Sequence, residues 1–223
     1  PDSVIYIPTV GNARQAKSVE KAGADAIMVQ GWEAGGHGAT IASSVLIPEV
    51  VDAVKLPVIA AGGISDGRGL AAALAFGADG IAMGTRFAAS QESPLLQELK
   101  QVFLDAIDSD ALKRDVWDGL PLRAIPGGKM RNYRGWWTHF WDLLPCALSE
   151  KKMQGASYRD LIEIIKFLRQ IKASPFQFAV GMNKVRKTFE TANISNGLLA
   201  AGQVVGRIND ILTCREIIER TNN

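Results

Sequence analysis

The sequence predicts an α/β protein in which strands and helices alternate along the first half of the chain. Four short apolar runs, expected as strands, lie at 4–7, 26–29, 57–61 and 79–83. They are apolar throughout, which is typical of parallel strands buried on both faces. The joint Gly-Ala-Asp at Gly23 returns at Gly77, each time just before an expected strand. Repeated βα units of this kind indicate a βα barrel or a doubly wound sheet.

Residues that commonly begin and end helices lie between these strands. Ser43 or Ser44, and later Asp66, are of the types that cap a helix N-terminus with a side-chain oxygen. Gly23 and Gly77 stand where a glycine often follows a helix end. The expected helices therefore lie at 12–22, 43–55, 66–77 and 94–107.

The second half of the chain has a different rhythm and is expected to be helical. Trp136–Trp141 is an aromatic cluster, Tyr158–Ile171 has the spacing of an amphipathic helix, and Leu198–Ile218 predicts one or two short helices. The cluster, which contains His139, is read as a helix face in a core, with a lid or a subunit contact as alternatives. If the cluster is a subunit contact, the protein would form a homo-oligomer, and the sequence does not decide this. We expect two domains, a partial βα barrel at 1–110 and a helical C-terminal region at 111–223.

Composition and charge exclude several classes of protein. With 47% hydrophobic and 22% charged residues the chain has the composition of a folded domain. No apolar run approaches the roughly 18 residues that span a bilayer, and a formal net charge of +2 does not indicate a nucleic-acid partner. Cys146 and Cys214 are too few for a disulfide framework or a metal site, and no signal-peptide pattern follows Pro1, so we expect a cytoplasmic protein.

The two halves carry charge of opposite sign. Residues 1–110 hold 7 Lys and Arg against 13 Asp and Glu, whereas residues 111–223 hold 18 against 10. This asymmetry suggests two structural units that dock on each other. A basic tail for polyanions is disfavoured, because the basic residues are scattered among apolar ones.

Glycine-rich segments follow three of the expected strands. In a βα barrel the carboxyl ends of the strands carry the active site, and the loops after the last two strands often bind phosphate. Gly62 and Gly63, and then Gly84 and Thr85, would expose backbone N–H groups there, the first pair leading into a helix N-terminus. Glycines can also simply make tight turns, but two consecutive units that end alike favour phosphate.

The first glycine-rich loop contains His37, one of two histidines. A histidine on such a loop can approach a flat ligand and titrates near neutral pH, although on its own it reads as a surface residue. Glu33 either orients His37 or is simply solvated, and the sequence does not separate the two. The chain shows no Ser/His/Asp order, no paired carboxylates at catalytic spacing and no Walker-type phosphate loop.

Taken together, these motifs closely resemble the nitronate monooxygenase family. The resemblance rests on AGADAIMVQGWEAGGHG, PVIAAGGISDGRG and GADGIAMGTRF within residues 4–107, and on 198–218 with Gly202 and Gln203. It implies an FMN-dependent TIM barrel whose last four strands, 5–8, are those named above. Strands 1–4 would then be absent, so the chain is expected to be a C-terminal fragment that need not be active alone.

The resemblance also implies roles for individual residues. His37 would be the catalytic base, and the implied reaction is the oxidation of alkyl nitronates or nitroalkanes by O₂ to carbonyl compounds and nitrite. A flavin-dependent enoyl-acyl carrier protein reductase is one alternative and a non-catalytic half-barrel that associates with a partner is another. An IMP-dehydrogenase-like enzyme is disfavoured, because neither cysteine lies near a glycine-rich loop. The implied FMN-binding residues are Gln30, Gly35 and Gly36 along the ring and ribityl chain, and Gly62, Gly63, Met83, Gly84 and Thr85 around the phosphate.

Overall fold

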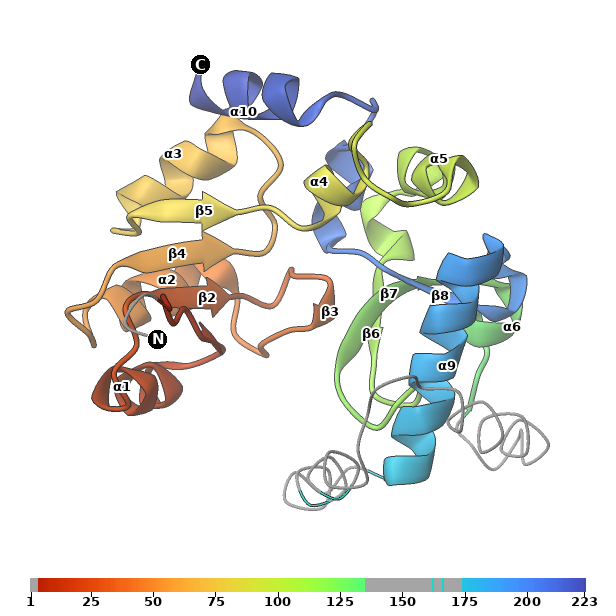
Figure 1. Cartoon of the computed structure of the whole chain (residues 1–223), viewed down its shortest axis with the longest axis horizontal. Coiled ribbons are helices and arrows are strands. Elements are labelled where there is room, and N and C mark those ends of the chain that lie inside the picture. The colour runs from red at the N-terminus through yellow and green to blue at the C-terminus, as the bar shows by residue number, and fades with distance from the viewer. Residues whose placement is uncertain (1–3, 135–161, 163–165, 167–173) are drawn as a thin grey trace. The chain divides into compact units, whose positions relative to one another are not determined.

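The computed structural model describes residues 4–134, 162, 166 and 174–223, and divides into two compact units (Figure 1). Unit 1 comprises Pro1–Ala111 and Ala200–Asn223, and unit 2 comprises Leu112–Leu199. The division expected from the sequence differs from this one, because it placed 200–223 in the second domain. This segment packs within unit 1, where the N–H of Gln203 donates to the carbonyl oxygen of Glu33 at 2.9 Å.

Unit 1 is built on a parallel sheet in the order β1-β2-β4-β5. Met28 in β2 pairs with Ile59 in β4, and Ala60 in β4 pairs with Ile81 in β5. The predicted parallel sheet in chain order is therefore confirmed. The strands are β1 (Thr9–Val10), β2 (Ile27–Gln30), β4 (Val58–Ala61) and β5 (Gly80–Ala82).

The first strand begins later than predicted. Residues 4–7 were expected as the strand, but ladder pairing starts at Thr9, opposite Met28. The reason is Pro8, which has no N–H to donate to a neighbouring strand. Tyr6 nevertheless lies alongside the next strand, because its carbonyl oxygen accepts from the N–H of Asp25 at 2.9 Å. The side chains of 4–7 remain exposed, Val4 and Ile5 to 71% and 72%.

Six α-helices lie in the described part of unit 1, and the predicted N-caps hold for only some of them. Asn12 caps α1 by accepting from the N–H of Gln15, and Asp66 caps α3 as predicted. Ser43 does not cap α2; it is the first helical residue, and its preceding residue Ala42 makes no side-chain cap. The helix α10 packs along α3 (Figure 1). The helices are α1 (Ala13–Lys21), α2 (Ser43–Val51), α3 (Gly67–Ala75), α4 (Thr85–Ala88), α5 (Gln97–Asp105) and α10 (Cys214–Asn222).

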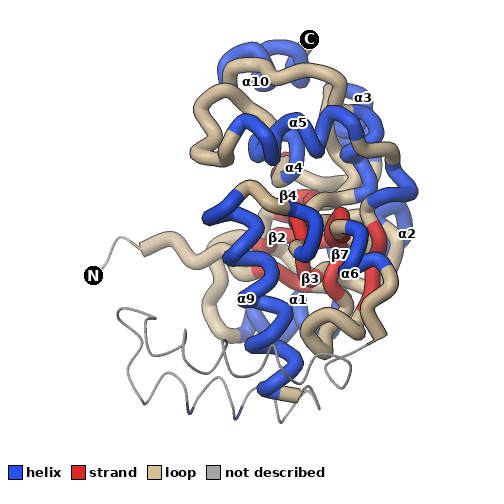
Figure 2. Tube along the Cα trace, turned by 90° about the vertical axis from the view of Figure 1, so that its right-hand side faces the viewer, coloured by secondary structure: helices blue, strands red, loops and turns tan. Residues whose placement is uncertain are grey.

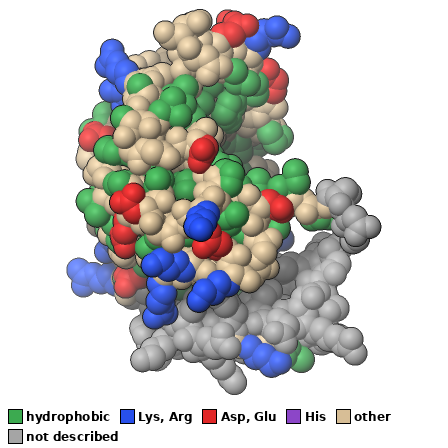
Figure 3. Space-filling model, turned by 90° about the vertical axis from the view of Figure 1, so that its left-hand side faces the viewer, with side chains coloured by type: hydrophobic (Ala, Val, Ile, Leu, Met, Phe, Trp, Pro, Cys, Tyr) green, Lys and Arg blue, Asp and Glu red, His purple; other side chains and the backbone are tan. Residues whose placement is uncertain are grey.

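The core of unit 1 lies between the sheet and its covering helices. In β2 the side chains of Ile27 and Val29 are fully buried, and in α2 those of Leu46 and Val50 are fully buried. Alternate residues of a strand point to opposite faces, so Met28 and Gln30 point away from this core. On the face seen in Figure 3, apolar side chains lie between charged ones at the surface.

Unit 2 contains strands as well as helices, which corrects the helical region expected at 111–223. β6 (Leu112–Arg114) pairs antiparallel with β7 (Leu122–Pro126), and β8 (Leu198–Ala200) pairs with β7. The strands were missed because they are short, and because an arginine and a proline in β7 are unfavourable signals for a strand.

The described part of unit 2 also contains helix α9 (Pro175–Thr191), the short α6 (Gly128–Arg131) and the 3₁₀ helix η3 (Ile194–Asn196) (Figure 2). Trp117 is fully buried, and its indole N–H donates to the carbonyl oxygen of Met130 at 3.0 Å. The Trp136–Trp141 cluster with His139, Cys146 and most of the helix expected at Tyr158–Ile171 lie outside the described residues. At 198–218 the expected short helices are preceded by β8 and include the 3₁₀ helix η4 (Gln203–Arg207).

Within the described residues, no helix is long and apolar enough to cross a bilayer. The same residues hold no cluster of His, Cys, Asp and Glu that could bind a metal ion.

Replacing Asp66 by alanine is expected to lower the free energy of unfolding by about 0.5–2 kcal/mol, the usual effect of losing an N-cap. The hydrogen bond from Arg207, at 2.7 Å, and those from the N–H groups of Gly69 and Arg68 lower the pKa of Asp66 below its ordinary value of 3.8. A depressed folded pKa contributes stability that is present above the unfolded pKa and is lost as the pH falls through the folded value. Melting temperatures between pH 7 and pH 2 should therefore show the difference between wild type and Asp66→Ala narrowing below about pH 4; a difference independent of pH would contradict this.

Candidate functional site

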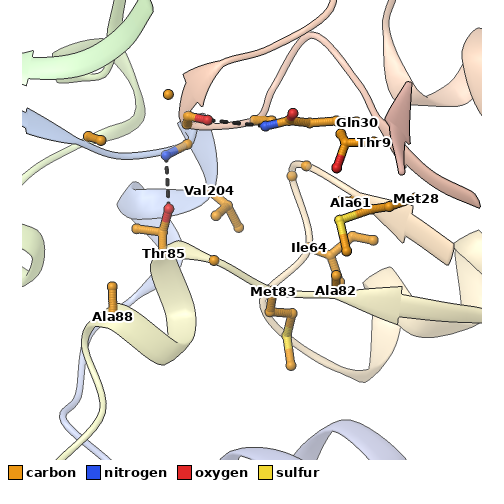
Figure 4. Close-up of a pocket in the computed structure, with 18 residues that line it drawn as sticks. Thr9, Met28, Gln30, Ala61, Ile64, Ala82, Met83, Thr85, Ala88 and Val204 are labelled. Carbon is orange, nitrogen blue, oxygen red and sulfur yellow. Dashed lines mark hydrogen bonds between the residues drawn. The ribbon is translucent and has the colours of Figure 1, made fainter. Parts of the chain in front are cut away.

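A pocket of about 450 Å³ lies at the carboxyl ends of the parallel strands of unit 1 (Figure 4). All of the cofactor-binding residues predicted from the sequence line it. His37 does not; it is the exposed second residue of β3 (Gly36–His37), directly after the lining residue Gly36. The lining residues are Thr9, Met28, Gln30, Ala34, Gly35, Gly36, Ala61, Gly62, Gly63, Ile64, Ala82, Met83, Gly84, Thr85, Ala88, Ala200, Gly202 and Val204.

One wall of the pocket is the sheet face that points away from the helices. The register pairs Thr9 with Met28 and pairs Gln30 with Ala61, so these side chains share one face. Ala82 continues this row on β5, opposite Ala61. The small side chains at the strand ends leave room that larger residues would fill. The sequence reading missed these wall residues, apart from Gln30, because an apolar strand residue carries no signal of which face it occupies.

The loop after β4 has a backbone that glycine favours. Gly62 and Gly63 have φ values of +100° and +74°, in the left-handed region that other residues rarely adopt. A Cβ on Gly62 would lie 3.1 Å from the backbone nitrogen of Ala34. The loops that follow β2 and β4 are therefore packed together at the mouth of the two strands.

The backbone conformation of Gly84, which follows β5, does not itself require a glycine, unlike that of Gly62 and Gly63. Its φ of −85° is open to any residue, and a Cβ built on it would meet no atom within 4 Å. Gly84 also lines the pocket, so its backbone there is not covered by a side chain. A ligand group can therefore approach the main chain here as closely as hydrogen bonding requires.

The sequence predicted that the N-terminus of α3 would help to bind a phosphate, but the side chain of Asp66 already caps it. Asp66 accepts from the N–H groups of Arg68 and Gly69 at 3.1 and 3.3 Å, and an ion pair with Arg207 holds the carboxylate. A second anion would meet the negative charge of this side chain. Any phosphate in the pocket must therefore be bound by the loop glycines themselves and not by the α3 helix end.

Two hydrogen bonds tie the pocket residues to each other (Figure 4). The side-chain amide of Gln30 donates to the carbonyl oxygen of Gly35 at 3.3 Å, which holds the first glycine-rich loop against β2. The hydroxyl oxygen of Thr85 accepts from the N–H of Gly202 at 2.9 Å. The Thr85 hydroxyl hydrogen remains available as a donor.

Glu33 has neither of the roles considered from the sequence. Its carboxylate accepts from the backbone N–H and from the hydroxyl of Ser43, the latter at 2.7 Å. A carboxylate at a helix N-terminus satisfies a free N–H and is favoured by the helix dipole. Glu33 thus supplies the cap that α2 lacks locally and fixes the glycine-rich loop to this helix.

A second wall of the pocket is formed by the segment that begins at Ala200. From the sequence, no residue of this segment was predicted to lie in the binding site. Gly35 and Gly202 approach each other so closely that a Cβ on Gly35 would lie 2.7 Å from the Gly202 nitrogen. The family resemblance covered this segment, but no residue pattern connected it with strands more than a hundred positions earlier.

Replacing Gly35 by alanine is expected to destabilise the protein by about 1–3 kcal/mol, the usual cost of overpacking. The new Cβ would lie 2.6 Å from the carbonyl carbon of Ala201, so the backbone must shift. Urea denaturation measures the effect. Gly80→Ala is the control, because a Cβ at Gly80 meets no atom within 4 Å; equal stability of both variants would show that 201–202 does not press on the loop.

Comparison with known proteins identifies the family. The family model described as nitronate monooxygenase matches residues 2–222. The chain belongs to the nitronate monooxygenase family. The family assignment made from the three glycine-rich motifs is therefore confirmed, and the named relatives of the chain are oxidoreductases.

Two kinds of curated relative resemble this nitronate monooxygenase family member over different lengths. The (3aS,4S,5R,7aS)-5-hydroxy-7a-methyl-1-oxo-octahydro-1H-indene-4-carboxyl-CoA dehydrogenase of Rhodococcus jostii is 36% identical over 97% of this chain and 63% of its own length. A probable nitronate monooxygenase of Staphylococcus aureus is 39% identical over 55% of this chain and 38% of its own length. The chain thus spans less than two thirds of each relative.

Solved structures confirm the fold class. FabK from Thermotoga maritima matches with a TM-score of 0.73 and 30% identity, over 98% of this chain and 60% of its own. Nitroalkane oxidase from Streptomyces ansochromogenes matches with a TM-score of 0.70 and 26% identity, over 98% of this chain and 56% of its own. Both are TIM barrels, and the parallel sheet of this family member corresponds to part of such a barrel.

Proposed function

We propose that the pocket binds FMN and that the chain forms the phosphate-binding side of a flavin-dependent oxidoreductase. The observation that carries the proposal is the convergence of all the predicted cofactor residues on one pocket. Its volume of about 450 Å³ lies in the range of ligand sites, about 300–1,000 Å³.

The pocket fits a phosphate in a specific way. The residues that line it, all in the described part of unit 1, include no ionisable side chain. A phosphate would therefore be bound by neutral donors, namely the N–H groups of Gly63, Gly84 and Thr85 and the Thr85 hydroxyl. The open space beside Gly84 allows that approach. Loop glycines after consecutive parallel strands of a barrel are a common phosphate site.

The rest of the pocket suits the remainder of FMN. Apolar side chains such as Met28, Ile64 and Val204 provide a surface for a flat ring, while Gln30 supplies a polar group at the end of β2. FMN, when bound, supplies the electron-transfer chemistry, and the protein provides binding, orientation and exclusion of water.

We assign His37 the role of general base on the substrate. It directly follows the lining residue Gly36 and is exposed, although it does not itself line the pocket. A neutral imidazole nitrogen can accept the proton of a carbon acid. In a neutral nitroalkane the nitro group makes the adjacent C–H acidic, whereas an alkyl nitronate has already lost that proton. Oxidation of nitronates by O₂ to carbonyl compounds and nitrite is the first candidate reaction.

A CoA thioester is the second candidate substrate, and one observation favours it. The CoA dehydrogenase of Rhodococcus jostii aligns with 97% of the chain, whereas the probable nitronate monooxygenase aligns with 55%. The likeness to the dehydrogenase thus extends well beyond the part shared with the monooxygenase. A thioester carbonyl also makes the adjacent C–H acidic, so the same base at His37 suits either substrate.

The visible absorbance spectrum of the whole enzyme, purified and then reconstituted with FMN, tests the proposal. We expect stoichiometric flavin bands that survive gel filtration; a protein that stays colourless would contradict FMN binding. Nitrite release from an alkyl nitronate in air would support the first reaction. Anaerobic bleaching of the flavin by an acyl-CoA, without nitrite chemistry, would support the second.

A further inference from the structure

Arg86 directly follows Thr85 and is almost completely buried. Its residue exposure is 5%, which is unusual for an arginine on a four-residue helix. Its Nη1 donates to the Asp210 carboxylate at 2.8 Å, and its Nη2 donates to the Asp210 carbonyl oxygen at 2.6 Å. The guanidinium thus donates hydrogen bonds to both the side chain and the main chain of Asp210.

Asp210 belongs to the segment that returns to unit 1 after Ala200. Its second carboxylate oxygen accepts from Arg220 of α10 at 3.0 Å, and this arginine is 63% exposed. An exposed pair contributes little, whereas a buried charge is costly unless it is paired. The Arg86 side chain is buried while that of Asp210 is 42% exposed, so this partly buried contact holds the segment more firmly than the one with Arg220.

Thr85, which lines the pocket, and its neighbour Arg86 are both held by the same returning segment. The N–H of Gly202 donates to the Thr85 hydroxyl oxygen at 2.9 Å, and Asp210 binds Arg86. Helix α4 also contacts η4 and α10, which lie in this segment. The returning segment thus holds the side chains of Thr85 and Arg86, the two residues that follow Gly84.

The charge of Arg86 is committed to Asp210 and the residue does not line the pocket. Arg86 can therefore influence an anion in the pocket only by fixing the positions of the neighbouring residues that line it. With only neutral donors in the pocket wall, the binding of a phosphate depends on how accurately the N–H groups of Gly84 and Thr85 are held.

We propose that Arg86 is a positioning residue that, through its bidentate contact with Asp210, holds Gly84 and Thr85 in the conformation that binds the phosphate of FMN. This inference rests on the proposed function. It predicts that the ion pair governs the preference of the protein for FMN over riboflavin, which differ only in the phosphate.

The test compares dissociation constants for FMN and riboflavin, measured by quenching of flavin fluorescence on the apoprotein of the whole enzyme. Arg86→Met should lower the preference for FMN by about tenfold or more, the loss expected for one hydrogen bond to a charged group. Riboflavin affinity should stay within about twofold, since the phosphate alone is affected. Arg86→Lys should recover part of the preference.

Arg207→Met is the matched control. It removes the ion pair of 2.7 Å between the same returning segment and Asp66, a residue that does not line the pocket. Both partners are substantially exposed, so this variant should change the melting temperature only slightly and leave the preference for FMN unchanged. An equal fall in preference in both variants would show a merely structural role and overturn the inference.

Two further outcomes separate the inference from the function on which it rests. An unchanged preference in folded Arg86→Met, with wild type preferring FMN, overturns the positioning role and leaves the proposed function standing. A wild type that binds neither flavin, or binds both equally, contradicts the phosphate site itself. If Arg86→Met does not fold, Asp210→Ala takes its place: it keeps the carbonyl contact with Nη2 and removes the carboxylate, and an unchanged preference again overturns the inference.

Discussion

Gly84→Val is expected to weaken FMN binding by about 100-fold or more while leaving the fold intact. The valine side chain would fill the space beside the backbone where the phosphate approaches. Losing two hydrogen bonds to a charged group costs roughly 3–6 kcal/mol in binding, and each 1.4 kcal/mol is about tenfold. The backbone accepts the change, since Gly84 has a φ of −85° and a Cβ there meets no atom within 4 Å. Flavin content after gel filtration and the FMN dissociation constant measure the effect.

Gly80→Val is the control for this experiment. Gly80 lies in β5 and does not line the pocket, and a Cβ on it also meets no atom within 4 Å. Valine suits a strand, so FMN should bind as in wild type. Gly63→Val should also abolish flavin retention, but its φ of +74° makes valine strained there. Undiminished flavin content in Gly84→Val would remove the loop after β5 from the phosphate site.

His37→Asn is expected to keep FMN and to lower the turnover of neutral nitroalkanes by about 10²–10⁴, the usual contribution of a general base. Turnover of the corresponding nitronates should fall much less, because they have no such proton to lose. Steady-state rates of nitrite release on the two forms of one nitroalkane measure the effect in the whole enzyme.

The two substrate forms serve as each other's control. Equal losses on the neutral and anionic forms would indicate damaged geometry and not a missing base. Full activity of His37→Asn on the neutral form would exclude His37 from the mechanism. If the substrate is an acyl-CoA thioester, the same variant should slow anaerobic flavin bleaching by a comparable factor, about 10²–10⁴.

The sheet and the glycine-rich loops that line the pocket could be predicted from the sequence because their signals are local. Apolar runs mark strands that are buried on both faces, and the Gly62-Gly63 pair marks a backbone with positive φ. The strand at Thr9 shows the limit of such reading: the β-branched run before Pro8 looks more like a strand than the residues that pair. The start of the strand lies after Pro8 because proline has no N–H to donate to the neighbouring strand.

The features that escaped prediction depend on residues far apart in the sequence. Ser43 looks like a cap, but the cap is the carboxylate of Glu33, which the glycine-rich loop brings there. Gly202 gives no local hint that its N–H will reach Thr85, which lies 117 positions earlier. Such contacts depend on the tertiary fold, which brings distant segments together. Hydrophobic periodicity and capping preferences report only on neighbouring residues, so they do not predict these contacts.

The split of unit 1 into 1–111 and 200–223 has a consequence for the newborn protein. A ribosome adds about 5–20 residues per second, and domains generally fold as units. When Leu199 has just been made, the strands of the sheet and the loops proposed to bind phosphate exist, yet the residues that hold Thr85 and Arg86 do not. Between the completion of the sheet at Ala82 and the arrival of Gly202 and Asp210 lie roughly 6–26 seconds of synthesis at these rates. Throughout this interval the pocket lacks the wall formed by Ala200, Gly202 and Val204, so under the proposed function we expect FMN to bind only after this segment has been synthesised.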